Sequence, residues 1–292
     1  MFEGFTRETI QVDGAAINLR RGGEGPPVLL LHGYPQTHAM WHRLAPLLAG
    51  EFSLVMPDLR GYGDSSKPPT DDRHEPYSKR AMALDLAQVM TALGHDRFAV
   101  VGHDRGGRVG HRLAADHGER VTRLAVLDIA PTEHMYARTD KEFATGYYHW
   151  FFLIQPFDLP ERMIGADPEY YLRRKMGQWS GKGSQFDPAA MAEYVRCFSM
   201  PETIHATCED YRAAAAIDLE HDAADMAAGR KLTCPLLALW GAKGLVGRKF
   251  DVLAAWRARA ETVSGHAVDS GHFLAEEAPE DTFASLRPFL AA

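Results

Sequence analysis

Gly102-His103-Asp104-Arg105-Gly106 is the stretch of sequence that decides the fold. It has the pattern of a nucleophile elbow, a tight turn from a strand into a helix that exposes one side chain above a mostly parallel sheet. Glycines on either side permit the close backbone approach that this turn requires. Residues 98–101 supply the apolar strand and residues 106–115 supply the helix. Because an aspartate stands where a serine is usual, the pattern predicts attack on saturated carbon rather than on esters.

Short apolar runs bounded by turn residues recur on both sides of this turn. They cover residues 28–31, 53–56, 98–101, 124–127 and 236–240. Amphipathic helical stretches lie between several of them, and this alternation predicts a parallel sheet covered by helices on both faces. Before the first run, an Asp13-Gly14 turn between residues 9–12 and 16–20 predicts an antiparallel hairpin. A closing helix is expected from about Pro279 to Leu290.

The alternation of strands and helices lapses in the middle of the chain. From Pro131 to Ala213 the sequence is rich in aromatic residues and has a helical pattern without a convincing strand. We therefore expect an α/β core made of residues 1–130 and 214–292. Residues 131–213 are expected to form a helical cap inserted over the ends of the strands.

Composition excludes several classes of protein. The net charge of -7 and the absence of any basic run longer than Arg173-Arg174-Lys175 argue against a nucleic-acid-binding surface. Three cysteines without C-x-x-C spacing predict neither a disulfide framework nor a zinc site. The glycine-rich residues 102–110 lack the G-K-[ST] ending of a phosphate-binding loop. We therefore expect neither a metal ion nor a cofactor.

Targeting signals are also missing from the sequence. The first residues lack a basic region followed by an apolar run, and nowhere are roughly eighteen apolar residues consecutive. These observations predict a cytoplasmic protein with no membrane partner.

Three residues in the order Asp104, Asp128 and His272 suit a two-step reaction. The Asp104 carboxylate can attack an sp3 carbon that bears a leaving group and form a covalent alkyl-aspartyl ester. His272, within Ser270-Gly271-His272-Phe273, is the predicted base that activates water to hydrolyse this ester. Asp128 is the predicted acid that orients the base, because it follows the strand 124–127, one strand after the nucleophile.

The sequence contains other acids that could be the partner of His272. Residues 241–244 follow the strand after which this acid often stands, and they contain none. Asp251 and Asp269 remain as alternatives to Asp128. The backbone N–H groups of Tyr34 and Arg105 are expected to form the oxyanion hole, since His32-Gly33-Tyr34-Pro35 follows the strand 28–31.

Two arginines next to the nucleophile predict the kind of substrate. Arg105 and Arg108 share a similar side of the first helical turn, where the helix dipole also attracts anions. Their planar donors suit a carboxylate, which this close to Asp104 leaves room for only a short 2-substituted acid. Surface salt bridges are the alternative role of these arginines.

The candidate leaving-group site lies in the aromatic segment. His149, Trp150 and the more distant Tyr211 each carry an N–H or O–H donor that could stabilise a departing halide. Packing between helices is the alternative role of these side chains.

The chain resembles the fluoroacetate (haloacetate) dehalogenases of the α/β-hydrolase superfamily over essentially its whole length. The motifs that carry the resemblance are His32-Gly33-Tyr34-Pro35-Gln36, Asp58-Leu59-Arg60-Gly61-Tyr62-Gly63-Asp64-Ser65, Gly102-His103-Asp104-Arg105-Gly106-Gly107-Arg108, His149-Trp150, Asp210-Tyr211-Arg212-Ala213-Ala214 and Gly271-His272-Phe273.

The resemblance implies an α/β-hydrolase fold and hydrolytic dehalogenation of short 2-haloacids. It implies an Asp104 nucleophile, an Asp128–His272 pair, Arg105 and Arg108 on the substrate carboxylate, and a halide site made of His149, Trp150 and Tyr211. It also implies a homodimer. Tyr34 departs from the phenylalanine expected in this family. Its phenol is expected to affect the rate of the reaction and the preference among halides.

Three other functions share parts of this pattern. An epoxide hydrolase uses the same aspartate and Asp–His pair with cap tyrosines as acids, but paired arginines suit a neutral epoxide poorly. A haloalkane dehalogenase is disfavoured for the same reason. A non-catalytic binder of small carboxylates would use the arginines but would not require the three catalytic residues.

Overall fold

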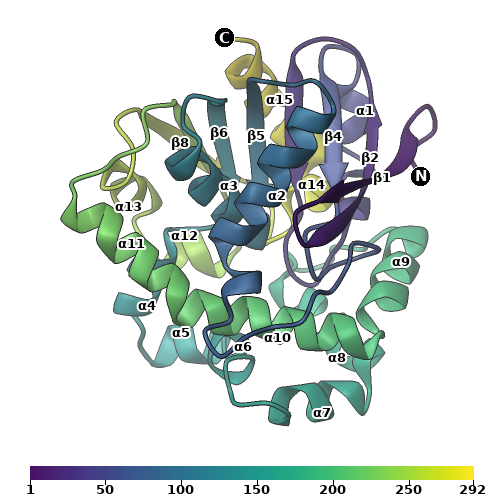
Figure 1. Ribbon diagram of the computed structural model, residues 1–292, viewed down its shortest axis with the longest axis vertical. Helices are drawn as coiled ribbons and strands as arrows, with labels where there is room; N and C mark the ends of the chain where they lie inside the picture. Colours follow the sequence, from purple (N-terminus) through teal and green to yellow (C-terminus); the bar gives the residue numbers. More distant parts are fainter.

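A single eight-stranded sheet runs through the computed structural model, which describes residues 1–292 (Figure 1). The strand order is β1-β2-β4-β3-β5-β6-β7-β8. The hairpin β1–β2 is antiparallel, β2 pairs antiparallel with β4, and the remaining neighbours are parallel. The strands are β1 (Thr6–Val12), β2 (Ala15–Gly22), β3 (Pro27–Leu31), β4 (Ser53–Pro57), β5 (Phe98–His103), β6 (Val121–Leu127), β7 (Leu236–Gly241) and β8 (Val263–Val268).

The five apolar runs and the hairpin predicted from the sequence are all strands of this sheet. The central strands β3, β5 and β7 are almost wholly buried, as is typical of parallel strands covered on both faces. The edge strand β8 was not predicted. It has the sequence Val-Ser-Gly-His-Ala-Val, and only Val268 of it is buried, so it lacks the apolar run by which the other strands were identified.

Helices cover both faces of the sheet, as expected. In Figure 1, α2 (Lys79–Ala92) and α3 (Arg105–Asp116) lie in front of the sheet and pack against each other. Behind it lie α1 (Ala45–Leu48) and α15 (Pro279–Ala291), which are in contact. The remaining helices of the core are η1 (His38–Trp41), η2 (Glu75–Tyr77), α12 (Leu245–Lys249), α13 (Val252–Arg257) and α14 (Leu274–Glu277).

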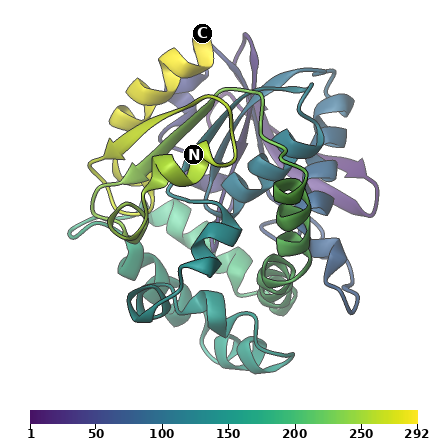
Figure 2. The same cartoon turned by 90° about the vertical axis from the view of Figure 1, so that its left-hand side faces the viewer.

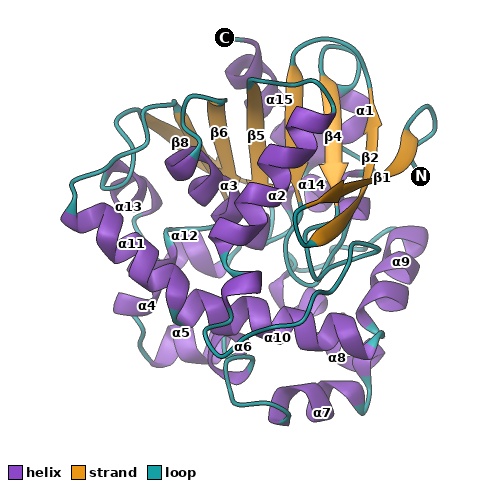
Figure 3. Cartoon of the chain, in the orientation of Figure 1, coloured by secondary structure: helices purple, strands orange, loops and turns teal.

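Between β6 and β7 the chain forms helices joined by loops and contains no strand (Figure 3). These helices gather at the end of the molecule toward which the parallel strands run, as both Figure 1 and Figure 2 show. The predicted boundary at Ala213 falls inside α10, and one more helix follows before β7. No helix has the length and apolar character that a membrane span requires. The helices are α4 (Thr132–Ala137), α5 (Lys141–Gly146), α6 (His149–Phe152), α7 (Leu159–Gly165), α8 (Pro168–Trp179), α9 (Pro188–Phe198), α10 (Pro201–Ala215) and α11 (Ile217–Ala227).

Glycines let the turn between β5 and α3 pack directly against β3. A Cβ atom on Gly102 would lie 2.5 Å from the carbonyl oxygen of Gly106. A Cβ atom on Gly106 would lie 2.4 Å from the carbonyl oxygens of both Leu31 and His32. The nearest atoms belong to the backbone and cannot rotate away, so only glycine fits at either position.

Gly106→Ala is therefore expected to lower the free energy of unfolding by about 1 to 3 kcal/mol, because the new methyl group overpacks the backbone of β3. Urea unfolding followed by circular dichroism measures the loss. Gly177→Ala, in the exposed part of α8 where a Cβ atom meets nothing within 4 Å, is the matched control. It should be neutral or stabilising by up to about 1 kcal/mol. Equal effects at the two sites would contradict the packing argument.

Candidate active site

Asp104 stands on the turn between β5 and α3 with an unusual backbone conformation. Its φ is 44° and its ψ is -114°, a strained combination for a residue that has a Cβ atom. The side chain is 7% exposed, and its Oδ2 accepts a hydrogen bond of 3.1 Å from the backbone N–H of Tyr34. A Cβ atom on Gly33 would come within 2.6 Å of the Asp104 Cβ. The loop after β3 thus holds one carboxylate oxygen of Asp104 by a backbone donor.

His272 and Asp128 form a buried pair. The Nδ1 of His272 lies 2.6 Å from Oδ2 of Asp128, whose Oδ1 accepts a 2.9 Å hydrogen bond from the Gly241 N–H. Of the three acids that the sequence left open, Asp128 is the one in contact with His272. Asp251 instead caps α13, and Asp269 is 76% exposed and pairs with Lys243.

The electrostatics of the site keep Asp104 charged and favour the charged form of His272. Burial by itself would raise the pKa of Asp104, but the charges of His272 and Arg108 outweigh it and lower this pKa. Burial by itself would lower the pKa of His272, but the hydrogen bond and charge of Asp128 raise it above its usual value. Asp104 is therefore a carboxylate at neutral pH, and Asp128 stabilises an imidazolium.

The backbone of His272 is held from two sides by residues that were not predicted to have a role. His103 Nε2 donates a 2.8 Å hydrogen bond to the His272 carbonyl oxygen, and the His272 N–H donates 2.9 Å to the carbonyl of Trp179. Burial lowers the pKa of His103 to about 3, so its ring is neutral and donates through Nε2. His103 precedes the nucleophile, a position that could have suggested such a role.

Both arginines beside Asp104 are buried, which excludes the surface salt bridges considered above. Arg105 directs Nε and Nη2 to the carboxylate of Asp210 at 2.8 and 2.7 Å, so most of its planar fork is already occupied. Arg108 donates through Nη1 to the Ala130 carbonyl oxygen and to Thr132, each at 3.0 Å. Two donors remain buried without a partner, Nη1 of Arg105 and Nε of Arg108.

Asp210 is the centre of a buried polar network that the sequence did not reveal. Besides Arg105, it accepts a 2.6 Å hydrogen bond from the Tyr62 hydroxyl and pairs with Lys79. Burial alone would raise the pKa of Asp210, but Arg105 and Lys79 lower it well below its ordinary range. Asp210 and Tyr62 lie in two of the motifs quoted above, yet only Tyr211 had been assigned a role there. The network fixes the orientation of the Arg105 guanidinium.

The three expected halide donors lie on one aromatic wall next to these arginines. The ring of Tyr211 lies 5.4 Å from that of His149 and 6.5 Å from that of Trp150. The guanidinium of Arg105 stands 4.1 Å over Tyr211, and that of Arg108 stands 4.7 Å over Trp150. The Nδ1 of His149 and the hydroxyl of Tyr211 are buried without a hydrogen-bond partner. Burial lowers the pKa of His149 well below its usual value, so its ring is neutral.

Tyr34 belongs to the same wall. Its ring is fully buried, stacks parallel to His149 at 6.0 Å and meets Tyr211 edge-on at 5.3 Å. The residue that departs from the expected phenylalanine therefore donates its backbone N–H to Asp104 and contributes its ring to the aromatic wall.

One cluster of side chains has the composition of a metal site. The ligand atoms of Glu161, His205 and Glu209 lie within 4.8 Å of one another. Arg212 donates hydrogen bonds of 2.7 Å to Glu161 and 2.6 Å to Glu209, so a guanidinium already balances both carboxylates. This cluster is an ion-pair network rather than a cation site.

The family model described as the alpha/beta hydrolase fold matches residues 26–279. The chain belongs to the α/β-hydrolase family. It is 46% identical to a fluoroacetate dehalogenase from Burkholderia sp over 100% of this chain and 95% of that protein. This match confirms the resemblance inferred from the motifs.

Two further relatives cover nearly the whole chain. A soluble epoxide hydrolase from Corynebacterium sp. (strain C12) is 35% identical over 98% of this chain and 97% of its own. The crystal structure of ALR0039 from Nostoc sp PCC 7120 is 61% identical, with a TM-score of 0.97 and 99% of each chain covered. This hydrolase is thus similar in sequence both to a dehalogenase and to an epoxide hydrolase.

Asp128→Asn is expected to lower the pKa of His272, because burial then acts without the opposing carboxylate. Titration of the histidine ring protons by NMR measures this pKa. Asp251→Asn and Asp269→Asn are matched controls that should leave it unchanged. A shift with either control, or none with Asp128→Asn, would contradict the pairing.

Proposed function

We propose that this hydrolase cleaves the carbon–halogen bond of short 2-haloacids, converting fluoroacetate or chloroacetate and water into glycolate, halide and a proton. The observation that carries the proposal is a group of buried donors without partners around Asp104. They are Nη1 of Arg105, Nε of Arg108, Nδ1 of His149 and the hydroxyl of Tyr211. Each unpaired buried donor costs about 1 to 3 kcal/mol, which an anion with a carboxylate at one end and a halogen at the other would offset.

In the first step, Asp104 displaces the halide. Its carboxylate attacks the carbon that bears the halogen, a C–O bond forms, and the C–X bond breaks with its electron pair leaving on the halide. The Tyr34 N–H occupies Oδ2, while Oδ1 accepts no hydrogen bond and is free to attack. Arg105 and Arg108 hold the substrate carboxylate, and His149, Trp150 and Tyr211 stabilise the developing halide.

In the second step, His272 removes a proton from water, and the resulting hydroxide attacks the ester carbonyl of Asp104. Negative charge develops on the carbonyl oxygen of the ester, where the N–H groups of Tyr34 and Arg105 stabilise it. Collapse of this intermediate breaks the bond between the Asp104 carboxyl carbon and the glycolate oxygen, which takes the proton from the His272 imidazolium. The Asp104 carboxylic acid then loses its proton to solvent and is restored as the carboxylate. Asp128 stabilises the imidazolium of His272 while it carries the proton. In the same proposal, residues 131–213 act as a cap over the site, and the family resemblance favours a homodimer.

Epoxide hydrolysis is the second candidate, because one relative over nearly the full chain is an epoxide hydrolase. Tyr147 and Tyr211 could supply the acids that protonate an alkoxide. The unpartnered donors weigh against it, since a neutral epoxide would bring no anionic acceptor to Nη1 of Arg105 or Nε of Arg108.

The purified enzyme is expected to release fluoride from fluoroacetate and chloride from chloroacetate, and Asp104→Asn should abolish both because an amide cannot form the ester. Ion-selective electrodes measure both halides side by side. Chloride release alone would count against the fluoride-stabilising role of the three donors. Undiminished release from Asp104→Asn would contradict the nucleophile. Diol formation from epoxides without any halide release would favour the second candidate.

Arg108→Leu is expected to raise KM for haloacetates at least about tenfold, because one charge-assisted contact to the carboxylate is lost. Initial rates against substrate concentration measure KM, and thermal unfolding measures stability alongside. Arg248→Leu, at an exposed arginine that pairs with Glu142, is the matched control and should leave KM unchanged. An unchanged KM for Arg108→Leu would remove this residue from the carboxylate site.

A further inference from the structure

The carboxylate of Glu277, at the end of α14, accepts four hydrogen bonds from uncharged donors. Oε2 accepts from the Gly181 N–H at 2.7 Å, the Ser184 hydroxyl at 2.7 Å and the Gly271 N–H at 2.9 Å. Oε1 accepts from the Phe273 N–H at 2.9 Å. A carboxylate is the one side-chain group that can accept on both oxygens, and charge strengthens each of these bonds. No step of the reaction above uses this residue.

Two of the four donors lie on either side of the catalytic base. Gly271 and Phe273 are the immediate neighbours of His272, so Glu277 fixes the backbone before and after it. Together with the hydrogen bonds from His103 and to Trp179, these contacts restrain the loop that directs the imidazole toward Asp128. A base must be held within a few tenths of an ångström of its working position, and a loop needs such supports to achieve this.

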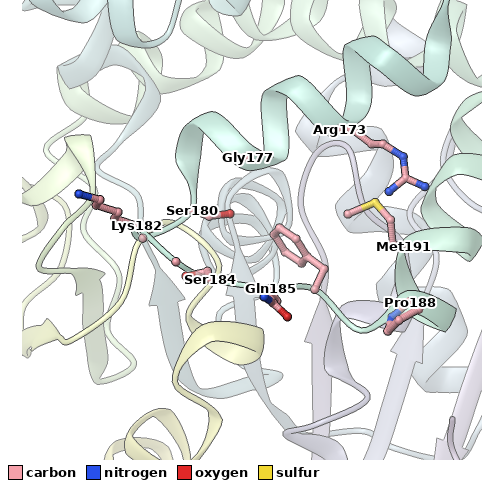
Figure 4. Close-up of a pocket in the computed structure, with 11 residues that line it drawn as sticks. Arg173, Gly177, Ser180, Lys182, Ser184, Gln185, Pro188 and Met191 are labelled. Carbon is pink, nitrogen blue, oxygen red and sulfur yellow. The ribbon is translucent and has the colours of Figure 1, made fainter.

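The other two donors come from the segment between α8 and α9, which Figure 4 shows as the loop carrying Ser180, Lys182, Ser184 and Gln185. This loop lines a pocket of about 720 Å³. It packs closely against the loop of the base, since a Cβ atom on Gly271 would lie 2.2 Å from the Gly181 nitrogen. The Glu277 carboxylate stands between the two loops and bonds to both.

We propose that Glu277 is a positioning residue that ties the segment Trp179–Ser184 to the loop of His272, so that the base keeps its position only while this segment is docked. Its effect on turnover rests on the proposed function, whereas its effect on the two loops does not. Loss of Glu277 would slow hydrolysis of the alkyl-aspartyl ester, which needs His272, and spare the formation of that ester, which needs Asp104.

The test compares Glu277→Gln with Glu277→Asp and with Glu280→Gln. The amide keeps the size of the side chain but places an N–H₂ group against at least one of the four donors. The aspartate keeps the charge but is one methylene too short to reach both loops. Glu280, 75% exposed and three residues further along, is the matched control for removal of a carboxylate. Ser184→Ala removes one bond on the side of the 179–184 segment and leaves Glu277 in place.

Three measurements are made on each protein. Trypsin cleavage after the exposed Lys182 reports docking of the segment. NMR titration of His272 reports its pairing with Asp128 in Glu277→Asp, which keeps the carboxylate charge that also raises the pKa of His272. Mass spectrometry of quenched chloroacetate reactions reports the fraction of enzyme held as ester. Glu277→Gln and Glu277→Asp should speed cleavage at Lys182 at least about fivefold and lower the His272 pKa. They should also raise the ester fraction at least about fivefold over the wild type.

Glu280→Gln should change none of these quantities, and Ser184→Ala should speed cleavage alone. The proposal would be overturned if both Glu277 variants were cleaved at the wild-type rate and if His272 titrated in both as it does in the wild type. So would equal slowing of ester formation and hydrolysis, which is what a purely structural role would cause. If Glu277→Gln does not fold, the same measurements on Glu277→Asp test the proposal. If the wild type releases no halide, the proposed function fails while cleavage and titration still test Glu277.

Discussion

The strained backbone at Asp104 is the constraint on which the rest of the structure depends. A residue with a Cβ atom keeps a φ of 44° only when its neighbours hold it in that conformation. Here the neighbours are backbone atoms of adjacent segments. Gly102 and Gly106 bring α3 against β3, and Gly33 brings the following loop against the nucleophile itself. The same contacts bring the Tyr34 N–H to the Asp104 carboxylate, so the strain and the proposed oxyanion hole have one origin.

Burial of two arginines is the second constraint, and it supports the proposal that the substrate is an anion. Bringing guanidiniums out of water is costly unless each is paired. Asp210 pairs Arg105, whereas Arg108 has only two oxygen acceptors, a methionine sulfur and a nearby indole ring. One donor of each arginine stays unsatisfied beside Asp104. Nearby positive charge lowers the pKa of Asp104, and the unsatisfied donors support the proposal that a substrate carboxylate binds beside it.

Local patterns predicted much of this molecule, and contacts between distant segments account for what they missed. Central strands such as β5 are continuous apolar runs, whereas the edge strand β8 is mostly exposed and has no such signature. The roles of Asp104, Asp128 and His272 follow from their order and stay predictions, although the structure brings the last two together. Asp210 could not be found in this way, because its partner Arg105 lies 105 residues away.

The two carboxylates of the site, Asp104 and Asp128, differ in the groups that each one contacts, and the proposed mechanism gives them different roles. Asp104 accepts a single backbone hydrogen bond and is surrounded by positive charge, so one of its oxygens remains available as a nucleophile. Asp128 has both oxygens engaged, one by His272 and one by the Gly241 N–H. Its backbone, with a φ of 53°, is also held in the left-handed region. In the proposed mechanism these different contacts suit Asp128 to orient His272 and leave Asp104 to attack the carbon.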